Sequence, residues 1–230
     1  MLNLQLDEKY SSESIRDYVY RMIKKNILYF NLKPGESLSE NTIGAALNAS
    51  RTPIRETFGR LLADGLLEIY PQKGTYVSLI DEKRVKESLF MRSVLEEANI
   101  KMACDKFPEQ ILFELESNLN QQNFCYEKGR FTDVFELDNK MHELLFIGCS
   151  MEHIWQAIQS ISADQNRICF LGLSSVSNWQ LAIKEHHLFI KSIKEKDAET
   201  ACNVMHNHIG RLQADIEHFK TQYSTYFKKL

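Results

Sequence analysis

Apolar residues recur at helical spacing in three short stretches of the first eighty residues. These stretches cover residues 11–29, 39–47 and 50–62, and each places its apolar positions on one face of a helix. Two segments of strand composition follow at residues 66–70 and 75–79, with a glycine-containing turn between them. This order predicts three helices followed by a β-hairpin.

From residue 81 onward the pattern is helical, and the only later proline is Pro108. The predicted helices cover residues 81–106, 108–128, 132–148, 152–171, 179–194 and 198–223, with a serine-rich loop at residues 172–178. Short connections between helices favour an antiparallel bundle of about six helices. We therefore predict a mainly α protein with a leader at residues 1–10, a first domain at residues 11–80 and an all-helical domain at residues 81–230.

The second and third predicted helices are separated by only three residues, and the third begins with basic side chains. Arg51, Thr52 and Arg55 lie at its exposed start, and Pro53 lies in its first turn, where the missing N–H costs nothing. Two short helices joined in this way are typical of a helix-turn-helix, whose second helix enters the major groove of DNA. These four residues are candidate DNA contacts. The alternative is that the arginines only solvate a surface helix.

The predicted hairpin would form a wing, with Lys73 and Gly74 at its basic tip. With these features the first eighty residues resemble the winged helix-turn-helix of the GntR family of bacterial transcription regulators. The resemblance is carried by residues 32–38, 50–56, 64–67 and 73–77. It implies that Arg51 and Arg55 contact bases and phosphates, with help from Thr52 and from the wing tip at Gly74.

The composition restricts the class of protein further. A chain of 230 residues is long enough for two domains. It has no run of eighteen apolar residues, and its N-terminus lacks the charged-then-apolar order of a signal peptide. We therefore expect a cytoplasmic protein without membrane contact. The five cysteines are spread without a C-x-x-C pair, which indicates neither a disulfide framework nor a thiolate zinc site.

The net charge of −3 is divided unevenly along the chain. Residues 1–80 carry ten Lys/Arg and nine Asp/Glu, a net charge of +1. Residues 81–230 carry eighteen Lys/Arg and twenty-two Asp/Glu, a net charge of −4. A net charge of +1 is small for a domain that binds the phosphate backbone of DNA. We therefore expect that affinity depends on two copies of the chain, as a homodimer on a palindromic double-stranded DNA operator.

Four polar residues of the second domain are predicted to converge inside the bundle. Asp138 and His142 are four residues apart and share one helix face, which otherwise carries apolar residues. His186 and His208 each lie about eleven residues from the tight turn at Asp197, so antiparallel packing brings them to the same level. One carboxylate and three imidazoles are a ligand set for a divalent transition metal with open coordination positions. The alternative is that each histidine is solvated or satisfied by an ordinary hydrogen bond.

Residues 84–220 resemble the helical effector domain of the FadR-like branch of the GntR family, the FCD (FadR C-terminal) domain. The resemblance is carried by Arg92, Glu96, Asp138, His142, Glu185, His186, Ile193, Asp197, Met205 and His208. It implies that the aspartate and three histidines hold a metal, expected to be zinc, nickel or manganese, and that a small carboxylic acid completes its coordination. Because all four ligand positions are filled, the resemblance argues against the acyl-CoA-binding variant of the domain.

Arg92 resembles a ligand-facing position of the same domain. Its guanidinium cannot lose its charge, so it would pair with a carboxylate effector. The alternative is an ion pair with Glu96, four residues later on the same helix.

The sequence as a whole predicts a homodimeric DNA-binding transcription regulator, expected to be a repressor, that responds to a small organic acid and is not an enzyme. One alternative is a metal-dependent hydrolase or lyase, because an Asp/His site with open positions could activate water. No motif supplies a general base for such a reaction. A second alternative is a regulator whose metal is purely structural.

Overall fold

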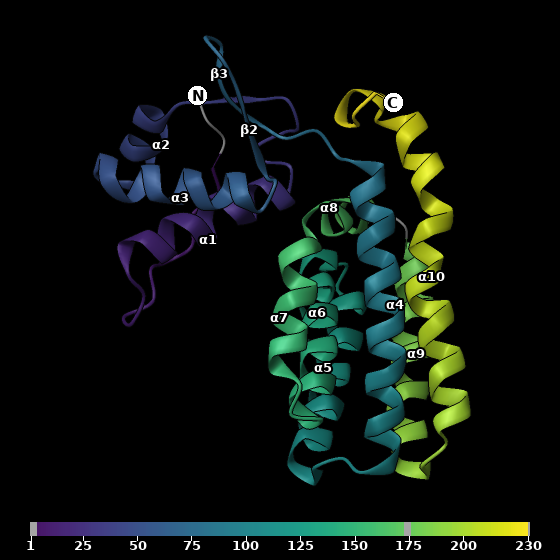
Figure 1. Cartoon of the computed structure of the whole chain (residues 1–230). Coiled ribbons are helices and arrows are strands. Elements are labelled where there is room, and N and C mark those ends of the chain that lie inside the picture. The colour runs from purple at the N-terminus through teal and green to yellow at the C-terminus, as the bar shows by residue number, and fades with distance from the viewer. Residues whose placement is uncertain (1–3, 173–175, 230) are drawn as a thin grey trace. The chain divides into compact units, whose positions relative to one another are not determined.

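The computed structural model describes residues 4–172 and 176–229. Its helices and strands are α1 (Ile15–Leu28), β1 (Ser37–Leu38), α2 (Glu40–Leu47), α3 (Arg51–Ala63), β2 (Leu67–Tyr70), β3 (Gly74–Val77), α4 (Glu82–Asp105), α5 (Glu109–Glu127), α6 (Phe131–Gly148), α7 (Glu152–Ile161), α8 (Ala163–Leu171), α9 (Val176–Glu195), α10 (Ala198–Gln222) and the 3-10 helix η2 (Ser224–Tyr226) (Figure 1). The predicted mainly α fold is confirmed. No helix of the described chain is long and apolar enough to cross a membrane.

The chain forms two compact units. The first contains residues up to Glu82 together with those from Lys220 onward, and the second contains Lys83–Phe219. The helical domain was expected to contain all of residues 81–230, whereas the residues from Lys220 onward belong to the first unit.

The first unit combines three helices with a small antiparallel sheet of strand order β1-β3-β2. The predicted hairpin pairs Leu67 with Val77 and Tyr70 with Gly74. Strand β1 was not predicted, because two residues, Ser37–Leu38, are too short to show an alternating pattern. Helix α3 packs on α1 and α2 through its buried side, which leaves its opposite side at the surface.

The C-terminal segment is attached to the first unit beside the link between β3 and α4. The backbone N–H of Ile80 donates to the carbonyl of Tyr226 at 2.8 Å, and that of Lys228 donates to the carbonyl of Ile80 at 2.9 Å. Phe227 is buried, and the ring of Tyr226 stacks on Phe30 with centroids 5.5 Å apart. The last residues of the chain are therefore held by both backbone and side-chain contacts.

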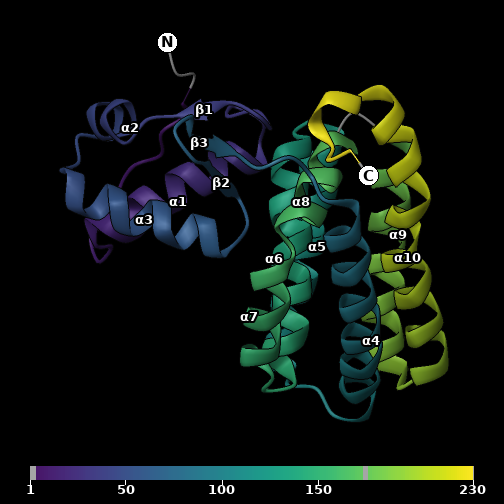
Figure 2. The ribbon, with the colours of Figure 1, turned by 45° about the horizontal axis from the view of Figure 1, so that its top comes forward.

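The second unit is a bundle in which α4 and α10 lie side by side and α5 packs on α6 and α9 (Figure 1; Figure 2). The described bundle runs from α4 to α10, one helix more than the six predicted ranges, because residues 152–171 form both α7 and α8. The break is at Ser162, whose hydroxyl donates to the carbonyl of Ile158 at 2.7 Å. Such back-bonding competes with the helical ladder.

One helix boundary also differs from the expectation. Helix α9 begins at Val176 and not near residue 179; residues 173–175 of the predicted serine-rich loop lie outside the described part of the chain. Three polar residues of α4, Arg92, Glu96 and Asn99, are buried, so these groups require partners inside the bundle.

Candidate metal site and DNA interface

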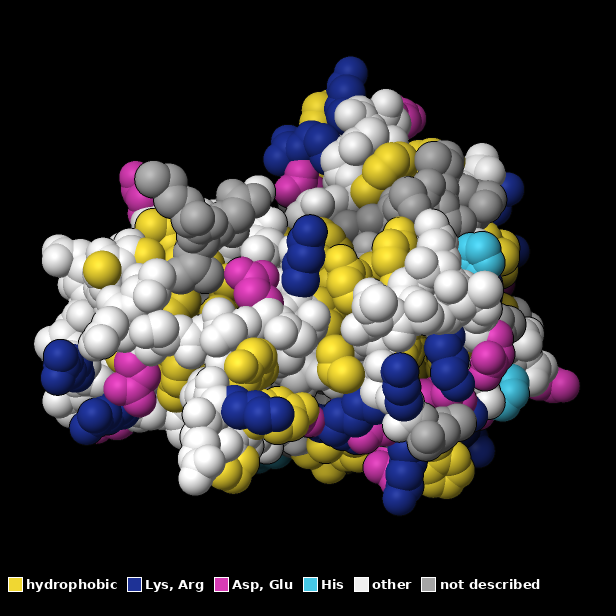
Figure 3. Space-filling model, turned by 90° about the horizontal axis from the view of Figure 1, so that it is seen from above, with side chains coloured by type: hydrophobic (Ala, Val, Ile, Leu, Met, Phe, Trp, Pro, Cys, Tyr) yellow, Lys and Arg dark blue, Asp and Glu magenta, His cyan; other side chains and the backbone are white. Residues whose placement is uncertain are grey.

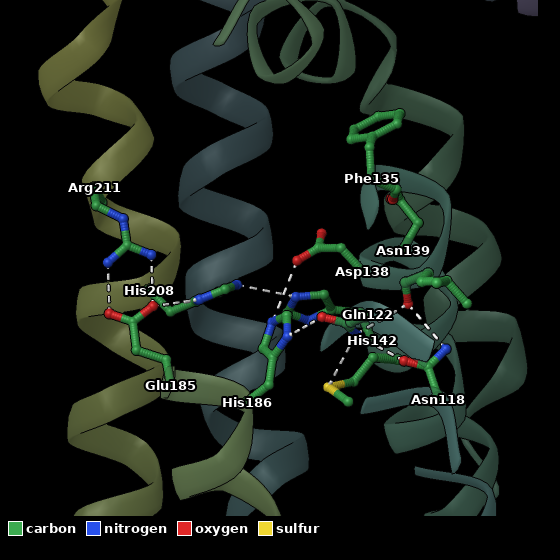
Figure 4. A network of polar contacts seen from close by, with 12 residues as sticks. Asn118, Gln122, Phe135, Asp138, Asn139, His142, Glu185, His186, His208 and Arg211 are labelled. Carbon is green, nitrogen blue, oxygen red and sulfur yellow. Dashed lines mark hydrogen bonds and ion pairs between the residues drawn. The ribbon is translucent and has the colours of Figure 1, made fainter. Parts of the chain in front are cut away.

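The four polar residues singled out in the helical domain converge inside the bundle (Figure 4). Asp138 and His142 extend from α6, His186 from α9 and His208 from α10. Each offers one ligand atom, and these four atoms lie within 4.8 Å of one another. The expectation that the α9–α10 hairpin brings the two later histidines to one level agrees with ring centroids 4.9 Å apart.

The separations within this cluster, Asp138–His142–His186–His208, fit one central ion. Nε2 of His142 lies 3.2 Å from Nε2 of His208, and Nε2 of His186 lies 3.3 Å from Oδ1 of Asp138. Two ligands that each lie about 2.1 Å from the same metal are separated by roughly 3.0–3.4 Å at octahedral or tetrahedral angles. The cluster is therefore already close to a coordination shell in size.

Each histidine of the cluster is oriented by a partner at its other ring nitrogen. Nδ1 of His186 donates to Oε1 of Gln122 at 2.8 Å, Nδ1 of His208 contacts Oε2 of Glu185 at 2.7 Å, and Nδ1 of His142 contacts the carboxylate of Glu96. Partners of this kind set the tautomer and leave Nε2 with its lone pair available to a metal. The three Nε2 atoms are the ones that approach other members of the cluster, His142 and His208 each other and His186 the carboxylate of Asp138.

Nε2 of His186 has no hydrogen-bond partner among the described residues although it is fully buried. The carboxylate of Asp138 at 3.3 Å is near it but lacks hydrogen-bond alignment. A buried nitrogen without a partner is unusual in a folded protein. A metal ion is a fitting partner for this nitrogen, and the donor set of three imidazoles and one carboxylate suits a divalent transition metal.

The charges of the carboxylates support the same interpretation. Burial raises the pKa of Asp138, but the contact with His186 and the neighbouring imidazoles outweigh it and hold the pKa below its ordinary value. Burial also opposes ionisation of Glu96 and Glu185. Arg92 and His142 nevertheless lower the pKa of Glu96 to about 2. Arg211 and His208 likewise lower the pKa of Glu185 to about 2. These carboxylates are therefore ionised at neutral pH.

The histidine pKa values shift in the direction that metal binding requires. Burial lowers the pKa of His208 to about 4 and also lowers the pKa of His186. A histidine must be neutral to donate its lone pair to a metal. Both imidazoles are thus in the binding form at neutral pH.

Arg92 has the ion pair with Glu96 that the sequence offered as an alternative to a ligand role. That pair uses Nε, whereas Nη2 is buried and has no hydrogen-bond partner in the described chain. Arg92 also lines a cavity of about 100 Å³ that reaches Asp138 and His208. The ion pair with Glu96 therefore leaves one guanidinium nitrogen of Arg92 without a partner in the described chain.

The residues that orient the histidines were not all found from the sequence. Glu96 was considered as the partner of Arg92 and, like Glu185, as part of a motif, and Gln122 was not considered at all. The signal for Gln122 lies in α5, where the buried Asn118 and Gln122 interrupt a stripe that contains Leu115 and Leu119. Two amides at i and i+4 on a buried face indicate an internal polar partner.

The candidate DNA contacts lie in the first unit. Arg51, Thr52 and Arg55 are exposed, and Pro53 is partly exposed at the start of α3, because the buried face of this helix consists mainly of residues further along. Nε of Arg55 lies 3.0 Å from Oε2 of Glu40 on α2 in a solvent-exposed pair. Such a pair contributes little to stability, so Arg55 can exchange this partner for DNA at small cost.

The tip of the β-hairpin carries the remaining two candidates, Lys73 and Gly74, which are exposed. Gly74 has a φ of +118° with open space around the position of a Cβ atom, a conformation that favours glycine. Seen from above, Lys and Arg side chains are mixed with acidic and uncharged ones and form no continuous basic patch on that face (Figure 3).

Two family models match the chain. The family described as "Bacterial regulatory proteins, gntR family" matches residues 15–77, which include the candidate DNA contacts. The family described as "FCD domain" matches residues 87–211, more than half of the chain. This second match includes Arg92 and all four members of the cluster.

Two curated relatives align with most of this chain. The HTH-type transcriptional repressor RspR of Escherichia coli (strain K12) is 27% identical over 218 residues, which cover 95% of this chain and 96% of RspR. The uncharacterized HTH-type transcriptional regulator YdhC of Bacillus subtilis (strain 168) is 28% identical over 203 residues, 87% of this chain and 89% of YdhC. Among solved structures, E. coli McbR/YncC has the same fold, with a TM-score of 0.77 and 22% identity over 92% of this chain and 99% of that one.

Proposed function

Because this chain belongs to the GntR family of bacterial regulatory proteins and carries an FCD domain, it is a transcription regulator and not an enzyme, and we propose that it is a metal-containing repressor controlled by a small carboxylate. The observation that carries this proposal is the cluster of three imidazoles and one carboxylate beside a cavity with an unpartnered arginine nitrogen. Asp138, His142, His186 and His208 would hold the ion.

The charge around the cluster supports an anionic effector. Asp138, Glu96 and Glu185 contribute three negative charges, and Arg92 and Arg211 contribute two positive ones. The resulting net charge of −1 becomes +1 when a divalent ion binds. Zinc, nickel or manganese would supply open coordination positions for a carboxylate oxygen. Nη2 of Arg92 would donate to the same carboxylate, because guanidinium matches carboxylate geometry.

Homodimer formation is supported by an apolar stripe on the outer face of α4. Phe90 and Val94 are 74% and 51% exposed and lie one helical turn apart, and Met102, about two turns further along, is 44% exposed. A contiguous apolar patch on a soluble protein usually marks an interaction site. We assign it to a second copy of the chain, because two recognition helices roughly 34 Å apart would match a palindromic operator.

The route from effector to DNA is supported by the continuity of α10. His208 and Arg211 lie on this helix, which continues to Gln222 and leads into the segment paired with Ile80 in the first unit. A shift of α10 on effector binding would therefore act on the link between β3 and α4. A coupling of about 1 to 3 kcal/mol between the two ligands would change operator affinity roughly 5- to 150-fold.

The repressor assignment is supported by RspR, which is named a transcriptional repressor and aligns along nearly the whole chain. The experiment is a binding titration with fragments of the intergenic DNA next to the gene, at one stated salt concentration. Metal-loaded protein should bind one fragment specifically, and a small carboxylate should change that affinity. If chelation lowers the melting temperature while no carboxylate changes DNA binding, the metal is purely structural and the effector proposal fails.

A further inference from the structure

We propose that the helical unit has a second ligand site, at the end of the bundle where α4, α6 and α9 finish, and that this site binds a nucleoside polyphosphate. It is a cavity of about 1100 Å³ lined by residues of the α4–α5, α6–α7 and α9–α10 connections, at the lower end of the bundle in Figure 1. Among the described residues, none lines both this cavity and the one beside the cluster. The inference is therefore independent of the proposed carboxylate effector.

Three lysines give this cavity a positive charge. Lys101 lies on α4, Lys106 directly after it and Lys196 in the α9–α10 turn, and all three are exposed. Within the described chain, no ion pair or hydrogen bond uses their ammonium groups. Asp105 is the one carboxylate of the described lining, so three positive charges and one negative charge leave +2. Such a local excess, in a domain of net charge −4, favours a ligand with several negative charges.

Two residues of the lining occupy backbone positions that favour glycine. Ser150 and Lys196 have φ angles of +57° and +56° just beyond the ends of α6 and α9. At both positions the backbone N–H groups bond back to the last turn of the helix, a pattern in which glycine is usual. Glycine does occupy this position beyond α3 and α5, as Gly65 and Gly129. Other residues held in this conformation concentrate at functional sites, and the free ammonium group of Lys196 suggests binding as the reason here.

The apolar part of the lining includes an aromatic wall. The half-buried ring of Phe107 lies against Gly148 so closely that a Cβ atom at Gly148 would overlap it. The missing side chain of Gly148 therefore allows the ring to cover the end of α6. Met102 and Pro108 add apolar surface to the same cavity. An aromatic side chain in such a position can stack on a nucleobase, because every base has a π-face.

A nucleoside polyphosphate combines the two properties that this lining requires. Its phosphates match the lysines, because lysine binds phosphate as a point charge, and its base matches Phe107. A volume of about 1100 Å³ is large enough for a whole nucleotide, since pockets for such ligands measure roughly 300 to 1,000 Å³. Inorganic polyphosphate would engage the lysines but leave the aromatic wall uncovered.

The test uses the full-length, metal-loaded protein with magnesium present, which limits extraction of the cluster's metal by phosphates. Calorimetry compares ATP with adenosine, which lacks the phosphates, and with inorganic triphosphate, which lacks the base. We expect ATP to bind roughly tenfold more tightly than either probe. Equal affinities for ATP and triphosphate would overturn the nucleotide assignment, and no binding of ATP would overturn the site. Either result would leave the proposed function standing.

Two variants locate the binding in this cavity. Lys101→Gln and Lys196→Gly each remove one ammonium group and should each weaken ATP binding roughly three- to fivefold. Lys194→Gln is the matched control, because Lys194 is an exposed lysine near the end of α9 that pairs with Glu116 outside the cavity, and its affinity should equal that of the wild type.

The melting temperature separates a binding role of Lys196 from a structural one. Glycine adopts positive φ without strain, so Lys196→Gly should melt no lower than the wild type although it binds ATP less tightly. Lys101→Gln tests the same site without changing a turn. Unchanged ATP affinity in both variants, or an equal loss in Lys194→Gln, would overturn the inference.

Discussion

Nδ1 of His208 lies 2.7 Å from Oε2 of Glu185, and the same carboxylate accepts two hydrogen bonds from Arg211, each 2.5 Å long. The three residues link α9 to α10 immediately beside the cluster (Figure 4). Glu185 thereby orients one imidazole of the candidate metal site, and Arg211 orients Glu185. The geometry of the site depends on this second layer as much as on the four ligand residues.

Replacing Glu185 with glutamine should weaken metal binding about 10- to 100-fold, because the amide is a poorer acceptor for the Nδ1–H of His208. Isothermal calorimetry with zinc measures the change. The matched control is Glu97→Gln, because Glu97 also pairs with a histidine of α10, His206, but in an exposed position away from the cluster. Equal losses in both variants would contradict a specific role for Glu185.

Arg55→Ala should weaken operator binding by about 1 to 3 kcal/mol if this side chain contacts a base. Fluorescence anisotropy at constant salt measures the change, and metal content should stay the same. Arg130→Ala removes an exposed charge from the helical unit and should leave affinity unchanged. If Arg55 served only as the partner of Glu40, Glu40→Gln would weaken DNA binding as strongly as Arg55→Ala.

The C-terminal segment should be needed for the response to effector more than for DNA binding itself. Phe227 is buried where the chain pairs with Ile80, so Phe227→Ala should loosen this attachment. We expect the ratio of operator affinities with and without effector to move towards one, with metal content unchanged. Lys229→Ala, at an exposed neighbouring position, is the control. A full effector response in Phe227→Ala would contradict transmission through this segment.

The metal-free protein should lose stability as the pH falls from about 6.5 to 4. Burial lowers the pKa of His208 from 6.5 to about 4, so the unfolded chain binds more protons than the folded one between these values, and stability declines towards acid. Melting temperatures of chelator-treated protein between pH 7.5 and 4.5 measure this effect. The fall in melting temperature towards acid should be smaller in His208→Gln than in His206→Gln. A melting temperature of the unaltered protein that does not change over this pH range would contradict the prediction.

The sequence was sufficient to predict those structural features that depend on the regular spacing of residues along a helix. Asp138 and His142 share a face because they are four residues apart, and the tight α9–α10 hairpin aligns His186 with His208. Gln122 could not be paired with His186 in the same way, because the two are 64 residues apart on helices whose relative register is set by packing. Orientation of the imidazoles is therefore a tertiary property.

The differences in fold have similar physical causes. The break at Ser162 depends on a hydroxyl bonding to the carbonyl four residues earlier, and serine is also common inside exposed helices, so its sequence position alone does not reveal the break. The return of Phe227 to Ile80 depends on contacts between the two ends of the chain. Periodicity identifies which face of a helix is buried, but not which distant segment covers it.

The central claim is that a small carboxylate controls operator affinity through the metal cluster. The most direct test measures operator affinity by fluorescence anisotropy for metal-loaded wild type, His208→Ala and His206→Ala, each with and without malonate. We predict a roughly 5- to 150-fold effect of malonate in the wild type and in His206→Ala, and none in His208→Ala, which should lose its metal and still bind DNA. An equal effect of malonate in His208→Ala, or no effect of malonate in the wild type, would contradict the account.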